Sequence, residues 1–235
     1  MKITYVYHSS FMIEDVLTNG EKVVLLFDYF KGELPAFDRN AYVYMFASHK
    51  HPDHFTLDLF RDFKDCPNIK FYLGNDIKLS DSYLERKGID PGIKSRIVRM
   101  PRHTMISDHG IVIETLDSTD QGVAFLVSYD GKTIFHAGDL NWWYWEGETA
   151  QEKKSMEKRF KQEIDRLKGR PIDVAFFPTD PRLEAYYDYG LSYLCEISCP
   201  KMIFPMHMWE QYEVIQRLKN DAKHSQYADR IQAYI

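Results

Sequence analysis

One short segment carries four side chains able to bind a metal ion, and its sequence is His49-Lys50-His51-Pro52-Asp53-His54. It directly follows an apolar run that predicts a buried strand. Side chains two residues apart in an extended segment point the same way, so His49 and His51 can reach one metal ion together. Pro52 breaks the strand, which lets Asp53 and His54 turn toward a second position. The spacing therefore predicts a metal site rather than a solvated histidine-rich loop.

The ligand types narrow the choice of metal. Imidazole and carboxylate ligands without a thiolate suit zinc, and they also suit iron or manganese. A metal held in this way lowers the pKa of bound water to about 7, which is the basis of metal-assisted hydrolysis.

The elements that must position these ligands follow from the hydrophobic pattern. Apolar runs of strand type occupy residues 3–7, 11–14, 23–27, 42–47 and 69–73 in the first half, and residues 111–115, 123–128, 132–135, 172–177 and 202–204 later. Asp130-Gly131 predicts a hairpin turn. Helical periodicity predicts helices near residues 156–167, 183–197 and 212–218. Two packed sheets with helices outside them, in one domain, is the layering that this order favours.

Four further segments support a family resemblance. The histidine-rich segment resembles the signature of the metallo-β-lactamase fold superfamily. Phe135-His136-Ala137-Gly138-Asp139 is similar to its Gly-Asp motif, whose aspartate usually bridges two metals, and Phe204-Pro205-Met206-His207 resembles the motif of its last ligating histidine. Tyr7-His8-Ser9-Ser10-Phe11 with Leu26-Phe27-Asp28 resembles the branch that holds ascorbate-lactone hydrolase.

The resemblance implies an α/β (α+β) fold, a four-layer αββα sandwich of two mixed β-sheets flanked by helices, as a single domain over residues 1–235. It also implies a hydrolase that uses a metal-activated water on a small ester, lactone or phosphodiester. One or two zinc ions are expected, with manganese or iron as alternatives. The ligands would be His49, His51, Asp53, His54, Asp139 and His207, and Asp53 would also orient or deprotonate the attacking water.

One position departs from the family pattern. The family places a histidine shortly before a strand such as residues 122–127, whereas this chain reads Leu116-Asp117-Ser118-Thr119-Asp120-Gln121. Asp120 is the favoured replacement because it is nearer the glycine, and Asp117 is the alternative. His103 and His109 lie upstream beyond a separate strand and are poorer candidates. Without a replacement the site would be weak, would take a different metal or would be empty.

That departure keeps a rival function open, namely a non-catalytic metal-binding sensor or scaffold of the same fold. A diiron redox role is a weaker rival, because those relatives typically have an acidic residue where His51 stands.

Other residues are candidates for contacts near the metals. His8 ends the first strand, where the resembling branch also places a histidine. Trp142 and Trp143 directly follow the Gly-Asp motif, and they either clamp the helix near residues 156–167 or wall the site and contact substrate.

The remaining polar residues have ordinary interpretations. His136 is expected in the core or behind the ligands, and His224 is expected at the surface. Asp180 and Arg182 are expected to form an ordinary salt bridge, or else to orient metal ligands.

Composition excludes several classes of protein. The 235 residues carry a formal net charge of −5, which argues against a nucleic-acid partner that binds through bulk charge. No run of about 18 apolar residues predicts a membrane span, and the opening residues do not resemble a signal peptide. Cys66, Cys195 and Cys199 have no CxxC spacing, which indicates a reducing, cytoplasmic location, and the last two are expected to be buried. The predicted partner is a small-molecule substrate, and the sequence does not predict an oligomeric state.

Overall fold

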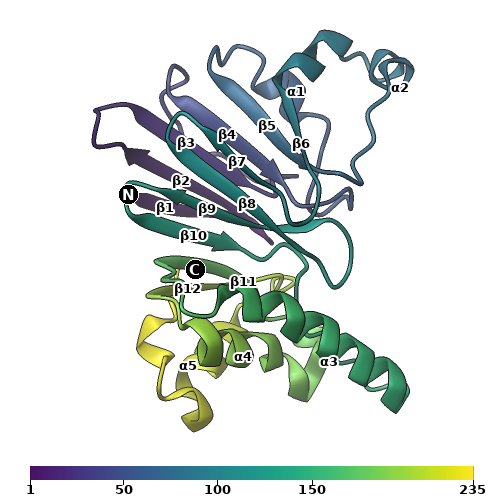
Figure 1. The fold of residues 1–235 in the computed structure, drawn as a ribbon, viewed down its shortest axis with the longest axis vertical. Helices are drawn as coiled ribbons and strands as arrows, with labels where there is room; N and C mark the ends of the chain where they lie inside the picture. The colour runs from purple at the N-terminus through teal and green to yellow at the C-terminus, as the bar shows by residue number, and fades with distance from the viewer. Residues whose placement is uncertain (235) are drawn as a thin grey trace. The chain divides into compact units, whose positions relative to one another are not determined.

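The structure is a computed structural model that describes residues 1–234. The chain divides into two compact units, Met1–Arg102 and the part that begins at His103. Each unit is built round its own six-stranded mixed sheet, as Figure 1 shows. The predicted fold class, two mixed sheets with helices, is therefore confirmed, whereas the single-domain assignment stays a prediction.

The first unit holds a sheet whose strands lie side by side in chain order. They are β1 (Lys2–Tyr7), β2 (Ser10–Val16), β3 (Lys22–Phe27), β4 (Tyr42–Ala47), β5 (Ile69–Gly74) and β6 (Ile97–Met100). The first three strands pair antiparallel and the last four pair parallel. Two short helices, α1 (Leu59–Asp62) and α2 (Asp81–Arg86), lie in the connections on either side of β5.

The core of this unit lies on its central strands. β3 and β4 are nearly continuous apolar runs and are almost wholly buried, as expected of central strands covered on both faces. Phe60 and Phe63 of the α1 region pack into the same core as Phe71 of β5. The short connections therefore cover the parallel half of the sheet with aromatic side chains.

The second unit repeats this arrangement with its own sheet. Its strands, from one edge to the other, are β7 (Met105–Asp108), β8 (Ile111–Asp117), β9 (Val123–Tyr129), β10 (Lys132–His136), β11 (Val174–Pro178) and β12 (Met202–Met206). β7 to β10 pair antiparallel, and β10 to β12 pair parallel. Asp130 and Gly131 both have positive φ, which confirms the predicted hairpin turn.

Three helices accompany the parallel strands of the second unit. They are α3 (Ala150–Ile164), α4 (Tyr189–Ser198) and α5 (Glu213–Asn220), and they gather beside β11 and β12 in Figure 1. A capping box between Thr149 and Glu152 starts α3, and Phe160 and Ile164 form its buried stripe. Gly190 allows α4 to pack closely, because a Cβ there would lie 2.1 Å from Asn141 Oδ1.

Most predicted elements are confirmed, and the differences concern short elements and one helix. The sequence pattern missed strands β6 and β7, which are only four residues each, and the short helices α1 and α2. The helix predicted over residues 183–197 is instead a 3₁₀ turn, Pro181–Tyr186, followed by α4, because Glu184 has a φ of 53° that no helix accommodates. Within residues 1–234, no helix is long and apolar enough to cross a membrane.

Strand direction decides where loop residues meet in each unit. β1, β3 and β4 run the same way, so the residues that follow them lie at one edge of the first sheet. β8, β10, β11 and β12 also share a direction, so the residues that follow them lie at one edge of the second sheet.

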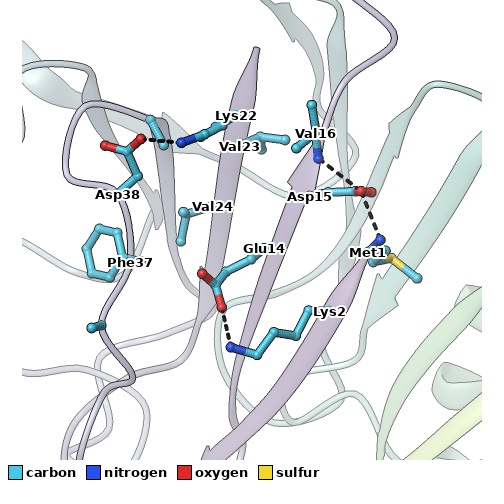
Figure 2. Close-up of a pocket in the computed structure, with 12 residues that line it drawn as sticks. Met1, Lys2, Glu14, Asp15, Val16, Lys22, Val23, Val24, Phe37 and Asp38 are labelled. Atoms are coloured by element: carbon cyan, nitrogen blue, oxygen red, sulfur yellow. Dashed lines mark hydrogen bonds and ion pairs between the residues drawn. The ribbon is translucent and has the colours of Figure 1, made fainter. Parts of the chain in front are cut away.

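The opposite edge of the first sheet has a different character. A cavity of about 720 Å³ lies there, where β1 and β3 begin and β2 ends. Its charged side chains pair with one another, Lys2 with Glu14 and Lys22 with Asp38 (Figure 2). One end of these strands therefore carries charged side chains that pair with one another. The other end carries the histidine-rich segment.

Candidate metal centre

In the first unit, three side chains converge from two strand ends. His8 follows β1, and Asp53 and His54 belong to the segment after β4. Each offers a ligand atom, and these atoms lie within 4.8 Å of one another. Asp53 Oδ2 is 3.5 Å from His8 Nε2 and 3.8 Å from His54 Nε2. These distances exceed an ordinary hydrogen bond, but two atoms bound to one tetrahedral zinc ion are about 3.4 Å apart.

A second pair of ligands comes from the same segment. His49 Nε2 and His51 Nδ1 are 2.9 Å apart, so both rings present a nitrogen to the same point. His49 is fully buried, and His51 is partly exposed. The two-residue spacing therefore brings the two ring nitrogens together, and their role as metal ligands stays a prediction.

Asp28 holds the histidine-rich segment in place through hydrogen bonds. It follows β3, is fully buried and has a φ of 43°. Its carboxylate accepts hydrogen bonds from Ser48 N at 2.6 Å, from Ser48 Oγ at 2.7 Å and from His54 Nδ1 at 2.7 Å. Because the Ser48 hydroxyl donates to Asp28, it accepts from His49 Nδ1 at 2.9 Å. Asp28 thus holds both histidines in the tautomer whose Nε2 carries a lone pair for a metal.

In the second unit, ligand candidates arrive singly from separate strand ends. Asp139 follows β10 and His207 follows β12, and both are nearly buried. His207 Nε2 lies 3.5 Å from Asp139 Oδ1, again close to the spacing of two ligands on one ion. Gly138 precedes Asp139 with a φ of 52°, and His207 itself has a φ of 61°. The backbone is therefore turned sharply at both positions to aim the side chains.

Asp180 supports His207 as Asp28 supports His54. It follows β11, is fully buried and accepts a hydrogen bond from His207 Nδ1 at 3.0 Å. Arg182 donates to both carboxylate oxygens through Nε at 3.0 Å and through Nη2 at 2.5 Å. Burial alone would raise the pKa of Asp180, but the hydrogen bonds from His207 and Arg182 lower that pKa to about 2. Asp180 is therefore a carboxylate at neutral pH.

Comparison with known proteins places the chain in a family. Residues 2–207 match the family model described as "Beta-lactamase superfamily domain". The chain belongs to this superfamily. The match includes every ligand candidate named above, which confirms the recognition of a metallo-β-lactamase fold hydrolase from its motifs.

Several members and neighbours of the superfamily are similar over most of the chain. A Heliobacterium modesticaldum protein named UPF0173 metal-dependent hydrolase is 25% identical over 231 residues, which is 92% of this chain and 86% of that protein. A candidate metal-dependent hydrolase from Parabacteroides distasonis has a TM-score of 0.52 at 16% identity, over 93% of this chain and 88% of the other. The metallo-β-lactamase fold protein YhfI from Bacillus subtilis has a TM-score of 0.51 at 10% identity, with 86% and 78% covered.

One neighbour carries a different chemistry. CmlA, a diiron β-hydroxylase from Streptomyces venezuelae, has a TM-score of 0.52 at 12% identity. The match covers 88% of this chain but only 44% of CmlA. At this identity the likeness concerns the fold alone.

The superfamily histidine that this chain lacks is best replaced by Asp120. A carboxylate oxygen of Asp120 lies within 4.8 Å of one of Asp139. Asp117 instead accepts a hydrogen bond from Ser118 N at 3.1 Å. His103 is bound to Glu163 at 3.0 Å, and His109 lies near Asp108. The local geometry favours Asp120, and its role as a ligand stays a prediction.

The two tryptophans after the Gly-Asp motif point to different neighbours. Trp142 packs against Phe160 of α3, with ring centroids 6.0 Å apart. The Trp143 ring lies 5.6 Å from that of His207, and its Nε1 donates to Asp139 O at 3.0 Å. Of the two, Trp143 lies beside the ligand candidates, and substrate contact by either stays a prediction.

Two expectations about other residues are corrected. His224 is fully buried rather than at the surface, because its ring is bonded to Leu218 O at 2.9 Å and to Asp188 Oδ2 at 2.6 Å. Cys195 and Cys199 are only partly buried, because they line a cavity of about 360 Å³. His136 is fully buried, as expected for a core position.

The sequence argument did not predict that two buried carboxylates each hold a histidine, because it used Asp28 only as part of a motif and Asp180 only as the partner of Arg182. Asp28 and Asp180 each come directly after a buried strand or one residue beyond it, at the same edge as the ligands. A polar residue at that place was the available signal. The hydrogen bond to a distant histidine is a tertiary contact that spacing along the chain does not reveal.

Proposed function

We propose that the chain is a zinc hydrolase whose metal ions are held by the histidine and aspartate side chains described above for each unit. The proposed ligands are His49, His51, Asp53, His54, Asp120, Asp139 and His207, with manganese or iron as alternative metals. One superfamily match runs from residue 2 to residue 207 and so includes both sets. The donor set, imidazole and carboxylate without thiolate, also suits zinc.

The observation that carries this proposal is a construction that occurs once in each unit. A buried carboxylate accepts from Nδ1 of a histidine, and Nε2 of that histidine faces another carboxylate at 3.5–3.8 Å. Such outer partners fix the tautomer and raise the basicity of ligating histidines. A histidine that served only packing would not need its second ring nitrogen directed at a carboxylate oxygen.

Metal ions bound there would make water acidic enough to act as a nucleophile at neutral pH. The protein supplies the remaining functions. In this proposal Asp53, which is partly exposed beside His8 and His54, orients the attacking water and accepts its proton. Asp28 and Asp180 keep the histidine rings fixed, so reorganisation during the reaction is small.

The proposed substrates are small esters, lactones or phosphodiesters in the cytoplasm. The fold itself does not choose among them, because one fold hosts many reactions. A metal-binding sensor or scaffold without activity is the competing function, and the aspartate in place of the family histidine is what favours it.

A substrate panel separates these functions. Metal-depleted chain is reloaded with zinc, manganese or iron and assayed with an aryl phosphodiester, a lactone and a thioester. Hydrolysis of one class that requires metal and disappears in Asp53→Asn is the expected result. Full metal occupancy without turnover of any class would favour the sensor or scaffold.

A further inference from the structure

Two tryptophans lie against the ring of His207, the last ligand candidate of the second unit, and a third tryptophan stacks on one of them. Trp143 and Trp209 each place a ring centroid 5.6 Å from that of His207, both roughly edge to face. Trp145 stacks against Trp143 with its ring nearly parallel, at a centroid distance of 6.0 Å. We call Trp143, Trp145 and Trp209 the aromatic shelf.

The shelf is accessible at its outer members. Trp143 is only 6% exposed, Trp145 is partly exposed and Trp209 is 43% exposed. An indole with 43% of its surface in water buries less apolar area than packing alone would favour. Exposed aromatic surface beside a reactive centre is typical of a binding site.

A cation lies between the exposed rings. The Arg182 guanidinium carbon is 4.6 Å from the Trp209 ring centroid and 5.7 Å from that of Trp145. The bonds to Asp180 fix the plane of the guanidinium, yet 46% of the Arg182 side chain remains exposed. The positive charge of Arg182 is thus held rigidly at the surface between two rings. Arg182 is bonded to Asp180, the carboxylate that accepts from His207.

We propose that the aromatic shelf and Arg182 bind the non-reacting part of the substrate, and that this part is a planar ring bearing an anionic oxygen group. The ring would lie on Trp145 and Trp209, and the carboxylate or phosphate oxygens would face Arg182. This assignment of substrate class rests on the proposed hydrolase function, because it presumes that His207 belongs to the reacting centre.

Charge and shape both support this class over the alternatives. Asp180 already accepts from Nε and Nη2 of Arg182, so a ligand anion would face the outer Nη edge of this planar cation, which suits a carboxylate or phosphate better than a neutral carbonyl. A purely aliphatic anion would leave the tryptophan faces in water, and a neutral ring would leave the arginine without an anionic partner from the ligand. A ligand with both features uses both surfaces.

Binding to the metal-depleted chain tests the inference independently of catalysis, because no metal is then present to attract the anion. Isothermal titration calorimetry would compare phenylphosphonate, benzoate, methylphosphonate and benzamide. The aryl anions should bind at least about tenfold more tightly than the ring or the anion alone. Preference for phenylphosphonate would assign a phosphate group, and preference for benzoate would assign a carboxylate.

Variants then connect that binding to the named residues. Arg182→Gln should weaken binding of the aryl anion about tenfold or more and leave binding of benzamide unchanged. Trp209→Ala should weaken binding of the aryl anion and of benzamide. Trp209→Phe should restore most of the affinity. Arg166→Gln is the matched control, because Arg166 is similarly exposed at 52% and also pairs with a carboxylate.

Two results would overturn the inference. The first is equal affinity for aryl and methyl phosphonates in the parent chain. The second is unchanged aryl-anion affinity in Arg182→Gln when circular dichroism shows that this variant is folded. The proposed function would fail by a different result. The metal-loaded chain would then bind the aryl anion but hydrolyse no substrate.

Discussion

His54 in the first unit and His207 in the second are supported in the same way but lie in different surroundings. Each donates Nδ1–H to a buried carboxylate, Asp28 or Asp180. Asp28 also accepts from the backbone N and the hydroxyl of Ser48, the residue directly before His49. Asp180 instead binds Arg182, whose side chain is nearly half exposed.

This difference indicates a division of labour. The first unit gathers its histidines in one six-residue segment over a closed hydrogen-bond network. The second unit takes one ligand candidate from each strand end and links the last of them to exposed arginine and tryptophan. We therefore expect mutations in the first unit to affect metal binding and folding, and mutations in the second to affect metal binding and substrate recognition.

The largest effect is expected for Asp139→Asn. If Asp139 bridges two metals, the amide keeps its shape but cannot bridge as an anion. The second metal should then bind more than about 100-fold more weakly, beyond the 10–100-fold effect of outer partners, and hydrolysis should fall with it. Metal analysis and thermal unfolding measure both quantities. Full metal occupancy with a midpoint lowered by several degrees would show that Asp139 is structural.

The comparison is tested directly by Asp28→Asn and Asp180→Asn. Each should weaken metal binding about 10–100-fold because a ligating histidine loses its anchor. Asp28→Asn should also cost about 1–3 kcal/mol of stability, since buried donors of Ser48 lose a charged acceptor. Asp180→Asn should additionally weaken aryl-anion binding, because Arg182 loses its fixed position. Metal titration, urea unfolding and ligand binding measure these effects. Identical results for the two variants would contradict the proposed difference between the two units.

A smaller effect is expected for Gly74→Ala at the end of β5. A Cβ there would lie 2.2 Å from Ser48 O, so the backbone that carries His49 must shift. The expected cost is about 1–3 kcal/mol, or a midpoint lower by roughly 2–10 °C, with several-fold weaker metal binding. Gly147→Ala is the control, because a Cβ at Gly147 meets nothing within 4 Å. Metal affinity unchanged in Gly74→Ala would mean that the segment tolerates the shift.

The smallest effect is expected for Asp120→Ala. Asp120 is exposed, so its removal should leave the unfolding midpoint within about 1 °C, as for most surface changes. Metal content should nevertheless fall, because Asp120 stands where the family has a ligating histidine. Asp117→Ala is the matched control and should keep its metal. Loss of metal in Asp117→Ala alone would reverse the assignment.

The sequence predicted local features better than distant contacts. The His49–His54 segment and the buried runs before it are contiguous, so spacing alone indicated both the metal chemistry and the strands. β6 and β7 were missed because each has only four residues, which is too short a run for a periodic pattern to stand out. The hydrogen bonds of Asp28 and Asp180 join residues 26 and 27 positions apart, and only the fold brings such partners together.

Zinc content per chain tests most directly whether the ligand candidates of each unit bind zinc. Inductively coupled plasma mass spectrometry would be applied to the parent chain, His54→Ala and His207→Ala after zinc loading and dialysis. We expect two zinc ions in the parent chain and the loss of at least one in each variant, with the chain still folded. Near-zero zinc in the parent chain, or an unchanged ratio in either variant, would contradict the proposal that the ligand candidates of each unit hold zinc.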